Sequence, residues 1–285
     1  MGVCHRRRRA ALTMLAKRLL VTIILLPIGL VIIWLGGVAY TFTIALILSL
    51  AAWEYSRLFR SVGLQPANLL IIAGVLLLTI GRAWNGFESA PWILSLLALA
   101  AMSYHLLAYE RGQEQPGTNF AVTLAGIFYL GWIGAYLVSL RNLPQGLWWF
   151  LLVLPSVWIA DSGAYMIGRS LGRHKLCPRL SPKKTWEGYI AGIITGTLGA
   201  ALLASIWRIA AGPDTAITAC NGALLGLILS VTTTLGDLGE SMMKRQAGIK
   251  DSSHLIPGHG GVFDRIDSWL WAGVIGYYVI VWLFL

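Results

Sequence analysis

Residues 19–53 read LLVTIILLPIGLVIIWLGGVAYTFTIALILSLAAW and contain no charged side chain. A helix of about 20 apolar residues crosses the hydrocarbon core of a bilayer, so this stretch is too long for one span. The pair Gly36-Gly37 divides it, because glycine readily adopts the backbone angles that end a helix. The stretch therefore predicts two membrane helices joined by a tight turn.

The rest of the chain continues this pattern. Further apolar runs, bounded by Gly, Pro or charge, cover 68–82, 91–109, 120–140, 146–167, 188–211, 216–238 and 268–285. The composition agrees, since 57% of the 285 residues are hydrophobic and 12% are charged, against about 25% charged residues in soluble domains. We expect an all-α, polytopic integral membrane protein with about nine transmembrane helices. A soluble enzyme, a disordered protein and a disulfide-rich secreted module are excluded.

The net charge of +10 follows from topology rather than from a nucleic-acid partner, and we expect no nucleic acid. Of the 22 Lys and Arg residues, 19 lie in the N-terminal tail or in every second loop. Such loops are cytoplasmic by the positive-inside rule, which places the N-terminus inside and the C-terminus outside. The remaining three, Arg82, Arg141 and Arg208, lie near the opposite ends of spans.

Three regions are predicted along the chain. Residues 1–18 form a basic cytoplasmic tail, and 19–140 hold about five membrane helices. Residues 141–285 form a catalytic region of about four helices with cytoplasmic loops 168–187 and 239–267. The first apolar stretch resembles a signal peptide, but a second span follows it directly, so we expect an uncleaved helix. Cys4, Cys177 and Cys220 have no metal-ligand spacing and are expected to be free thiols.

Asp161 stands within an apolar span. A carboxylate there is costly to bury and is a candidate functional residue, although an ion pair with a neighbouring helix would also explain it.

The segment 179–188, RLSPKKTWEG, precedes the next span. We expect a helix beginning there, with Ser181 as N-cap and Pro182 in its first turn. Lysines beside free helical N–H groups are typical of an anion site. The alternative is that these lysines are ordinary positive-inside charges.

The richest stretch is 235–267, LGDLGESMMKRQAGIKDSSHLIPGHGGVFDRID. Asp237, Glu240 and Lys244 share one helical face, and Asp264 and Asp267 stand three residues apart before the last span. Carboxylates suit a hard cation such as Mg²⁺, while neighbouring basic residues and glycines suit phosphates. The combination is typical of phosphoryl or nucleotidyl transfer. A juxtamembrane loop whose charges pair with one another is the alternative.

The pattern running from Ser241 to Asp267 closely resembles that of the bacterial phosphatidate cytidylyltransferases, or CDP-diacylglycerol synthases. The resemblance extends to 161–168, 181–188 and 236–241. It implies transfer of CMP from CTP to phosphatidate, by in-line attack on the α-phosphorus, giving CDP-diacylglycerol and pyrophosphate for phospholipid biosynthesis. It also implies a cytoplasm-facing polar cavity, Mg²⁺ with room for a second cation, and a homodimer in the bacterial inner membrane.

Roles follow from the positions that match this pattern. The resemblance implies catalytic roles for Asp237, Asp264, Lys244, Lys250 and His259, and metal binding by Asp237, Asp264, Asp267 and Glu240. It implies substrate binding by Asp161, Ser181, Lys184, Thr185, Glu187, Ser241, Arg245, Gly260, Gly261 and Arg265.

Three other classes compete with this interpretation. An ion-coupled transporter predicts an internal repeat and polar groups near the middle of the bilayer, whereas the polar groups here cluster at one interface. A CDP-alcohol phosphotransferase predicts an Asp-Gly-x-x-Ala-Arg run, which the sequence lacks. A non-catalytic scaffold gives no reason for the clustered charges.

Overall fold

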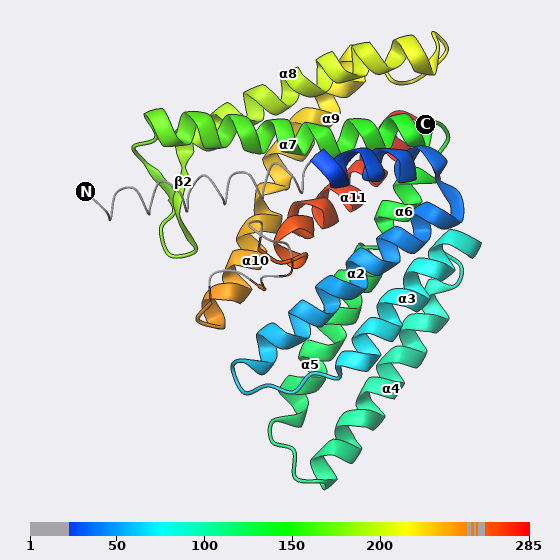
Figure 1. The fold of residues 1–285 in the computed structure, drawn as a ribbon, viewed down its shortest axis with the longest axis vertical. Coiled ribbons are helices and arrows are strands. Elements are labelled where there is room, and N and C mark those ends of the chain that lie inside the picture. Colours follow the sequence, from blue (N-terminus) through cyan, green and yellow to red (C-terminus); the bar gives the residue numbers. More distant parts are fainter. Residues whose placement is uncertain (1–22, 250–251, 254, 256–259) are drawn as a thin grey trace.

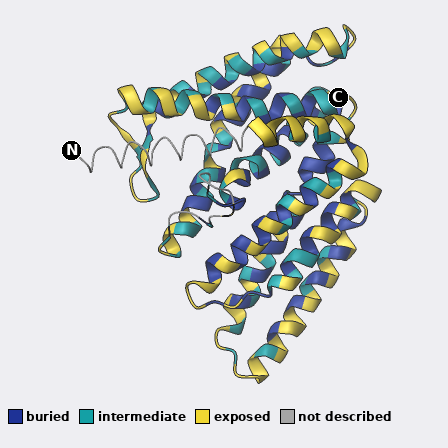
Figure 2. Ribbon diagram, viewed as in Figure 1, coloured by how far each residue is buried: buried dark blue, intermediate teal, exposed yellow. Residues whose placement is uncertain are grey.

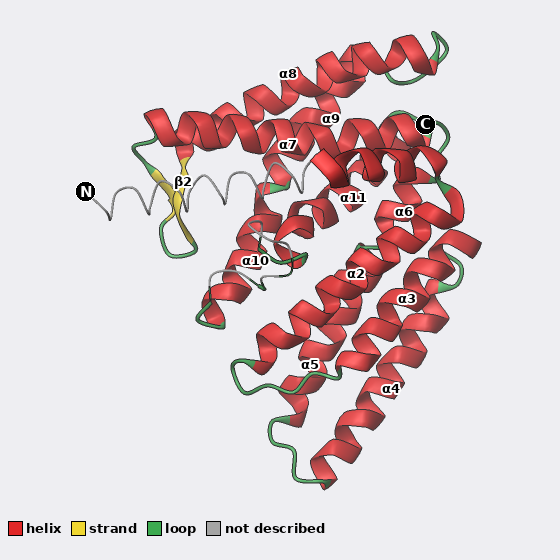
Figure 3. Ribbon diagram, viewed as in Figure 1, coloured by secondary structure: helices red, strands yellow, loops and turns green. Residues whose placement is uncertain are grey.

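The computed structural model describes residues 23–249, 252–253, 255 and 260–285, and helices dominate it (Figure 3). A helix over Ile23–Leu35 comes first. It is followed by α2 (Gly37–Arg60), α3 (Asn68–Asn85), α4 (Ala90–Glu110), α5 (Pro116–Gly126), the π-helical η1 (Ile127–Ile133), α6 (Tyr136–Arg141) and α7 (Gly146–Leu171). The chain continues through β1 (Lys175–Cys177), β2 (Ser181–Thr185), α8 (Trp186–Ala211), α9 (Ala219–Thr232), α10 (Thr234–Gln246) and α11 (Phe263–Leu283).

Eight stretches of the described chain are long and apolar enough to cross a membrane. Two of them combine several elements: Pro116–Arg141 joins α5, η1 and α6, and Ala219–Gln246 joins α9 and α10. The helix Ile23–Leu35 stands where the first predicted span is expected, and it is shorter than the others within the described residues. The prediction of an all-α multi-pass membrane protein is confirmed.

The outward faces of the helices are exposed and apolar. Large side chains such as Leu69, Trp84 and Ile209 are exposed there, and Figure 2 shows exposed positions along the outside of every long helix. In water such a surface would be unstable, but against lipid tails it costs nothing. The buried side chains form one apolar core between the helices, with Trp149, Tyr40 and Phe263 among its largest members.

The break at Gly36-Gly37 is confirmed. Both glycines have positive φ, 62° and 54° respectively. The turn is held by Arg141, whose Nε donates to the carbonyl of Ile33 at 2.8 Å and whose Nη2 donates to that of Trp34 at 3.2 Å. These carbonyls belong to the end of the first helix, where they lack helical partners.

Successive loops alternate between two ends of the molecule. The loops 61–67 and 111–115 and the β1–β2 hairpin lie at one end, and 86–89, 142–145 and 212–218 lie at the other (Figure 1). Like Arg141, the other two arginines at the second end make contacts within the fold. Arg82 lies 3.7 Å from the ring centroid of Phe87, and Arg208 donates to the carbonyl of Pro213 at 3.1 Å. Arg82 therefore packs against an aromatic ring, and Arg208 satisfies a carbonyl in the loop after α8.

Small residues bring α7 and α8 together. The buried positions of α8 are Gly188, Gly192, Gly196, Ala200 and Ala204. A Cβ at Gly188 would lie 2.7 Å from the carbonyl oxygen of Ala164 on α7 and 3.0 Å from the Cα of Gly168. This small-residue spacing allows close approach of membrane helices. It also brings the first turn of α8 beside α7, where Asp161 lies.

One local prediction is wrong. Ser181 is not a helix N-cap, because Ser181–Thr185 forms strand β2, paired antiparallel with β1. Thr185 is the N-cap of α8 instead, and its hydroxyl accepts from the amide of Gly188 at 3.2 Å. Pro182 is tolerated because each strand of a two-stranded sheet is an edge strand. The segment 239–267 begins and ends in helix, since α10 runs to Gln246 and α11 starts at Phe263, which agrees with the helical face predicted for Asp237, Glu240 and Lys244.

Candidate active site

A cavity of about 1180 Å³ opens among α7, the β-hairpin, α8, α10 and α11. Its walls hold five carboxylates, Asp161, Asp237, Glu240, Asp264 and Asp267. They also hold six basic side chains, Arg169, Lys175, Lys183, Lys184, Lys244 and Arg265. The charges that the apolar sequence otherwise avoids are gathered around one space.

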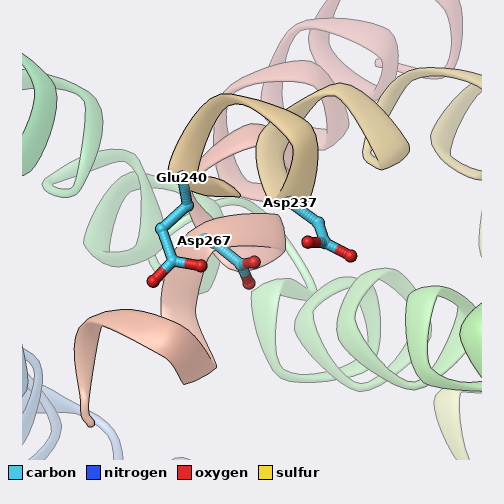
Figure 4. A group of neighbouring side chains, drawn as sticks. All are labelled: Asp237, Glu240 and Asp267. Carbon is cyan, nitrogen blue, oxygen red and sulfur yellow. The ribbon is translucent and has the colours of Figure 1, made fainter. Parts of the chain in front are cut away.

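Three carboxylates form the centre of the site. Asp237 and Glu240 stand one turn apart on α10, and Asp267 faces them from α11 (Figure 4). One oxygen of each lies within 4.8 Å of the others. Glu240 is 1% exposed and Asp267 is 7% exposed, so their mutual repulsion is poorly screened by water.

Gly236 allows the two helices to approach this closely. A Cβ there would lie 2.7 Å from the carbonyl oxygen of Asp267 and 2.7 Å from Cδ1 of Trp271. The residue that follows it, Asp237, therefore stands directly beside Asp267. The sequence motif Gly-Asp thus supplies both a close helix contact and one carboxylate of the cluster.

Lys244 connects Glu240 to a fourth carboxylate. Its Nζ lies 2.7 Å from Oε2 of Glu240 and 2.7 Å from Oδ1 of Asp264. The lysine side chain is 13% exposed, and the two carboxylates are 1% and 7% exposed. The other oxygen of Asp264 accepts from the amides of Ser252 at 3.0 Å and Gly261 at 2.8 Å.

The β-hairpin brings a second lysine to the site. Lys184, on β2, lies with its Nζ 2.6 Å from Oδ2 of Asp237. Glu187 fixes the base of this hairpin, because its Oε1 lies 2.7 Å from Nδ1 of His174 and both of its oxygens accept from the backbone amide of His174. The hairpin therefore holds Lys184 against α10.

The sequence of nearly the whole chain matches one protein family. A sequence model of the cytidylyltransferase family matches residues 16–283. The chain belongs to the cytidylyltransferase family. It is 33% identical to a Synechocystis protein named phosphatidate cytidylyltransferase, over 94% of this chain and 97% of that protein. Proteins of the same name from Pseudomonas aeruginosa and Bacillus subtilis are 36% and 33% identical, over 94% and 93% of this chain and 97% of each relative. This cytidylyltransferase is therefore an enzyme of the nucleotidyltransferase class.

Most of the predicted site residues of the cytidylyltransferase line the cavity. These are Asp161, Lys184, Thr185, Asp237, Glu240, Lys244, Asp264, Arg265 and Asp267. Asp161 reaches the cavity from α7, whereas the other carboxylates come from α10 and α11. Residues separated by about 100 positions in sequence thus share one site.

Other predicted residues support the walls rather than form them. The hydroxyl of Ser241 lies 3.4 Å from Oδ1 of Asp237, and Nε of Arg245 donates to the carbonyl of Leu180 in the hairpin at 3.3 Å. Gly260 and Gly261 lie beside Asp264, and a Cβ at Gly260 would be 2.9 Å from its Oδ2. Ser181 and Glu187 belong to the hairpin and its base. Lys250 and His259 lie outside the described residues.

The sequence interpretation missed several residues. Arg169, Lys175 and Lys183 line the cavity, as do the aromatic side chains of Trp158, Tyr165 and Trp269. Their signal was present, since the three basic residues lie in the predicted cytoplasmic loop 168–187. A further missed residue, Glu54, lies in the first half of the chain. It carries no motif, and only the fold places it next to Asp264.

Proposed function

We propose that the chain transfers CMP from CTP to phosphatidate and so produces CDP-diacylglycerol and pyrophosphate. The observation that carries this proposal is the cavity in which three clustered carboxylates stand beside Lys184 and Lys244. The names of the relatives give the substrates. A phosphate oxygen of phosphatidate forms a bond to the α-phosphorus of CTP, and the bond from that phosphorus to the bridging oxygen of pyrophosphate breaks.

The three carboxylates fit a hard divalent cation, for which Mg²⁺ is our proposal. Their donor atoms are oxygens within 4.8 Å of one another, and Oε1 of Glu240 is buried without a hydrogen-bond partner among the described residues. Carboxylate oxygens and substrate phosphates are the usual ligands of Mg²⁺. A bound cation would neutralise charge on the phosphates. Asp237, Glu240 and Asp267 would hold it, Asp264 contributes through Lys244, and a second cation remains part of the proposal.

The basic side chains would bind the phosphates of CTP and of the lipid. Lys175, Lys183 and Lys184 come from the hairpin, and Arg169 and Arg265 come from the ends of α7 and α11. They line the same cavity as the carboxylates. Positioning and charge neutralisation of this kind account for most catalysis of phosphoryl chemistry.

The aromatic side chains of the cavity suit the lipid substrate. The rings of Trp158 and Trp269 lie 6.0 Å apart, and Tyr165 is exposed on the same helix as Trp158. Such side chains prefer the interface between lipid and water. We propose that they contact the glycerol and acyl portion of phosphatidate.

The bacterial relatives support an inner-membrane location, and the distribution of charge supports a cavity that faces the cytoplasm. The cavity lies at the end of the molecule that carries the hairpin, which is also the lysine-rich end. By the positive-inside rule this end is cytoplasmic, where CTP is available. We also propose a homodimer, on the strength of the family resemblance.

The proposal is tested with purified protein in mixed micelles containing phosphatidate and labelled CTP. We expect CDP-diacylglycerol and pyrophosphate to form in equal amounts, and neither to form when Mg²⁺ is chelated. Diacylglycerol replaces phosphatidate in the control, because it lacks the attacking phosphate. Pyrophosphate release that does not depend on phosphatidate would contradict the proposal.

A further inference from the structure

Glu54 is a fully buried carboxylate that the reaction proposed above does not use. It belongs to α2 and is 0% exposed. Its position is fixed by neighbouring packing, since the ring of Tyr55 meets that of Phe263 edge to face with centroids 6.1 Å apart. An apolar helix has no structural need for such a side chain, and burial of a carboxylate requires strong compensation.

The compensation comes from the segment that leads into α11. Oε1 of Glu54 accepts from the amide of Val262 at 3.0 Å and from the hydroxyl of Ser253. Oε2 accepts from the amide of Phe263 at 2.7 Å and from the hydroxyl of Ser252 at 3.0 Å. The four donors are two amides and two hydroxyls, and the partners stand about 200 residues away in sequence.

Two of these donors are the first amides of a helix. Val262 is the N-cap of α11 and Phe263 its first residue, and α11 has no side-chain cap of its own. The first N–H groups of a helix lack internal acceptors and carry partial positive charge. Glu54 therefore caps α11 from another helix, and it does so one residue before Asp264.

The contact continues into the active site. The hydroxyl of Ser252 lies 3.0 Å from Oε2 of Glu54 and 3.0 Å from Oδ2 of Asp264. A hydroxyl has one proton, so Ser252 can donate to one of these carboxylates at a time. Gly261 is packed against Ser252 and Glu54, because a Cβ there would clash with the hydroxyl of Ser252 and would lie 2.5 Å from Oε2 of Glu54. Asp264 in turn contacts Lys244, which contacts Glu240.

We propose that Glu54 is a positioning residue for nucleotidyl transfer. It fixes Ser252, Ser253 and the start of α11, and thereby sets the orientation of Asp264 and Lys244 beside the carboxylate cluster. The first half of the chain, which holds α2, thus helps to position the residues of the active site. This inference rests on the proposed function for its kinetic consequences, but its structural consequence can be measured separately.

The test compares Glu54→Gln with Glu110→Gln, a control at the exposed end of α4. Glutamine has the shape of glutamate, but its NH₂ group replaces one of the two accepting oxygens. This donor would then face the N–H and O–H donors that the carboxylate oxygen accepted from. The stoichiometry of CTP binding at equilibrium gives the number of intact sites in each sample. The rate constant kcat is divided by this number, so that loss of folded protein is not mistaken for loss of catalysis. Because small misplacements of catalytic groups can cost about 100-fold in rate, we expect kcat per site to fall at least about tenfold in Glu54→Gln. Affinity for CTP should stay within about threefold, and Glu110→Gln should match the wild type.

A second measurement follows hydrogen exchange of the Val262 and Phe263 amides. We expect faster exchange in Glu54→Gln, with amides of α8 unchanged. The inference is overturned if kcat per site stays within twofold of the wild type, if activity falls only in proportion to lost CTP sites, or if exchange is unchanged. A wild-type protein without phosphatidate-dependent pyrophosphate release would overturn the proposed function instead, and the exchange measurement would still decide the role of Glu54.

Discussion

Asp267 tests the proposed cation site at the scale of one residue, since it is 7% exposed and lies in one cluster with Asp237 and Glu240. Asp267→Asn keeps the size of the side chain and removes its charge. One lost ligand removes several kcal/mol of transition-state stabilisation, so we expect kcat to fall at least about 100-fold. The Mg²⁺ concentration that gives half-maximal rate should rise, which a kinetic titration measures. Asp214→Asn, in the exposed loop at the opposite end, is the control. An Asp267→Asn enzyme with normal turnover would contradict the site.

Lys244 has a structural role that is separable from catalysis. It forms ion pairs with Glu240 and Asp264, both nearly inaccessible to water. Removal of one partner from a buried ion pair costs about 3–5 kcal/mol, because the remaining charge is uncompensated. We therefore expect Lys244→Met to lower the thermal unfolding temperature in detergent by several degrees. Adding Glu240→Gln to the same chain should restore part of the loss. Lys183→Met, on the exposed face of β2, should unfold like the wild type, and an equally stable Lys244→Met would show that the pair is unimportant.

At the scale of the element, α10 offers a matched pair of glycines. Gly236 contacts α11, whereas a Cβ at Gly239 would have nothing within 4 Å. Gly236→Ala must push α10 away from Asp267, and overpacking of this kind costs about 1–3 kcal/mol. We expect at least about tenfold lower activity, because the carboxylates separate. Gly239→Ala should retain activity and gain up to about 1 kcal/mol from its higher helix propensity. The activity and the thermal unfolding temperature of the two variants are compared. Equal activity and equal stability of Gly236→Ala and Gly239→Ala would refute the close-contact role of Gly236.

The elements also show which sequence signals were sufficient. Long apolar runs predicted the membrane helices, because the requirement to satisfy backbone groups in lipid leaves few alternatives. The hairpin at 175–185 was missed, since Ser181-Pro182 is equally suited to a helix start and to an edge strand. Local preference could not decide between them. The tertiary pairing of Lys175 with Thr185 does so.

Across the whole molecule, the carboxylates of α10 and α11 were predictable and Glu54 was not. Asp237, Glu240 and Asp267 lie within 31 residues of one another in a segment whose charge contrasts with the apolar chain. Glu54 stands 198 residues from Ser252, so their contact depends on how α2 packs against α11. Such a contact is a property of the assembled fold, which one sequence does not reveal.

The orientation of the molecule gives a prediction based on two native cysteines. Cys177 lies in the hairpin beside the cavity, and exposed Cys220 lies in the first turns of α9 at the other end. If the lysine-rich end is cytoplasmic, these thiols face opposite sides of the membrane. We would combine Cys4→Ser with either Cys220→Ser or Cys177→Ser, so that each protein keeps one cysteine. A membrane-impermeant maleimide added to intact spheroplasts should label Cys220, and it should label Cys177 only after permeabilisation. The reverse pattern would place the cavity outside, away from cytoplasmic CTP, and would contradict both the orientation and the access route of the nucleotide.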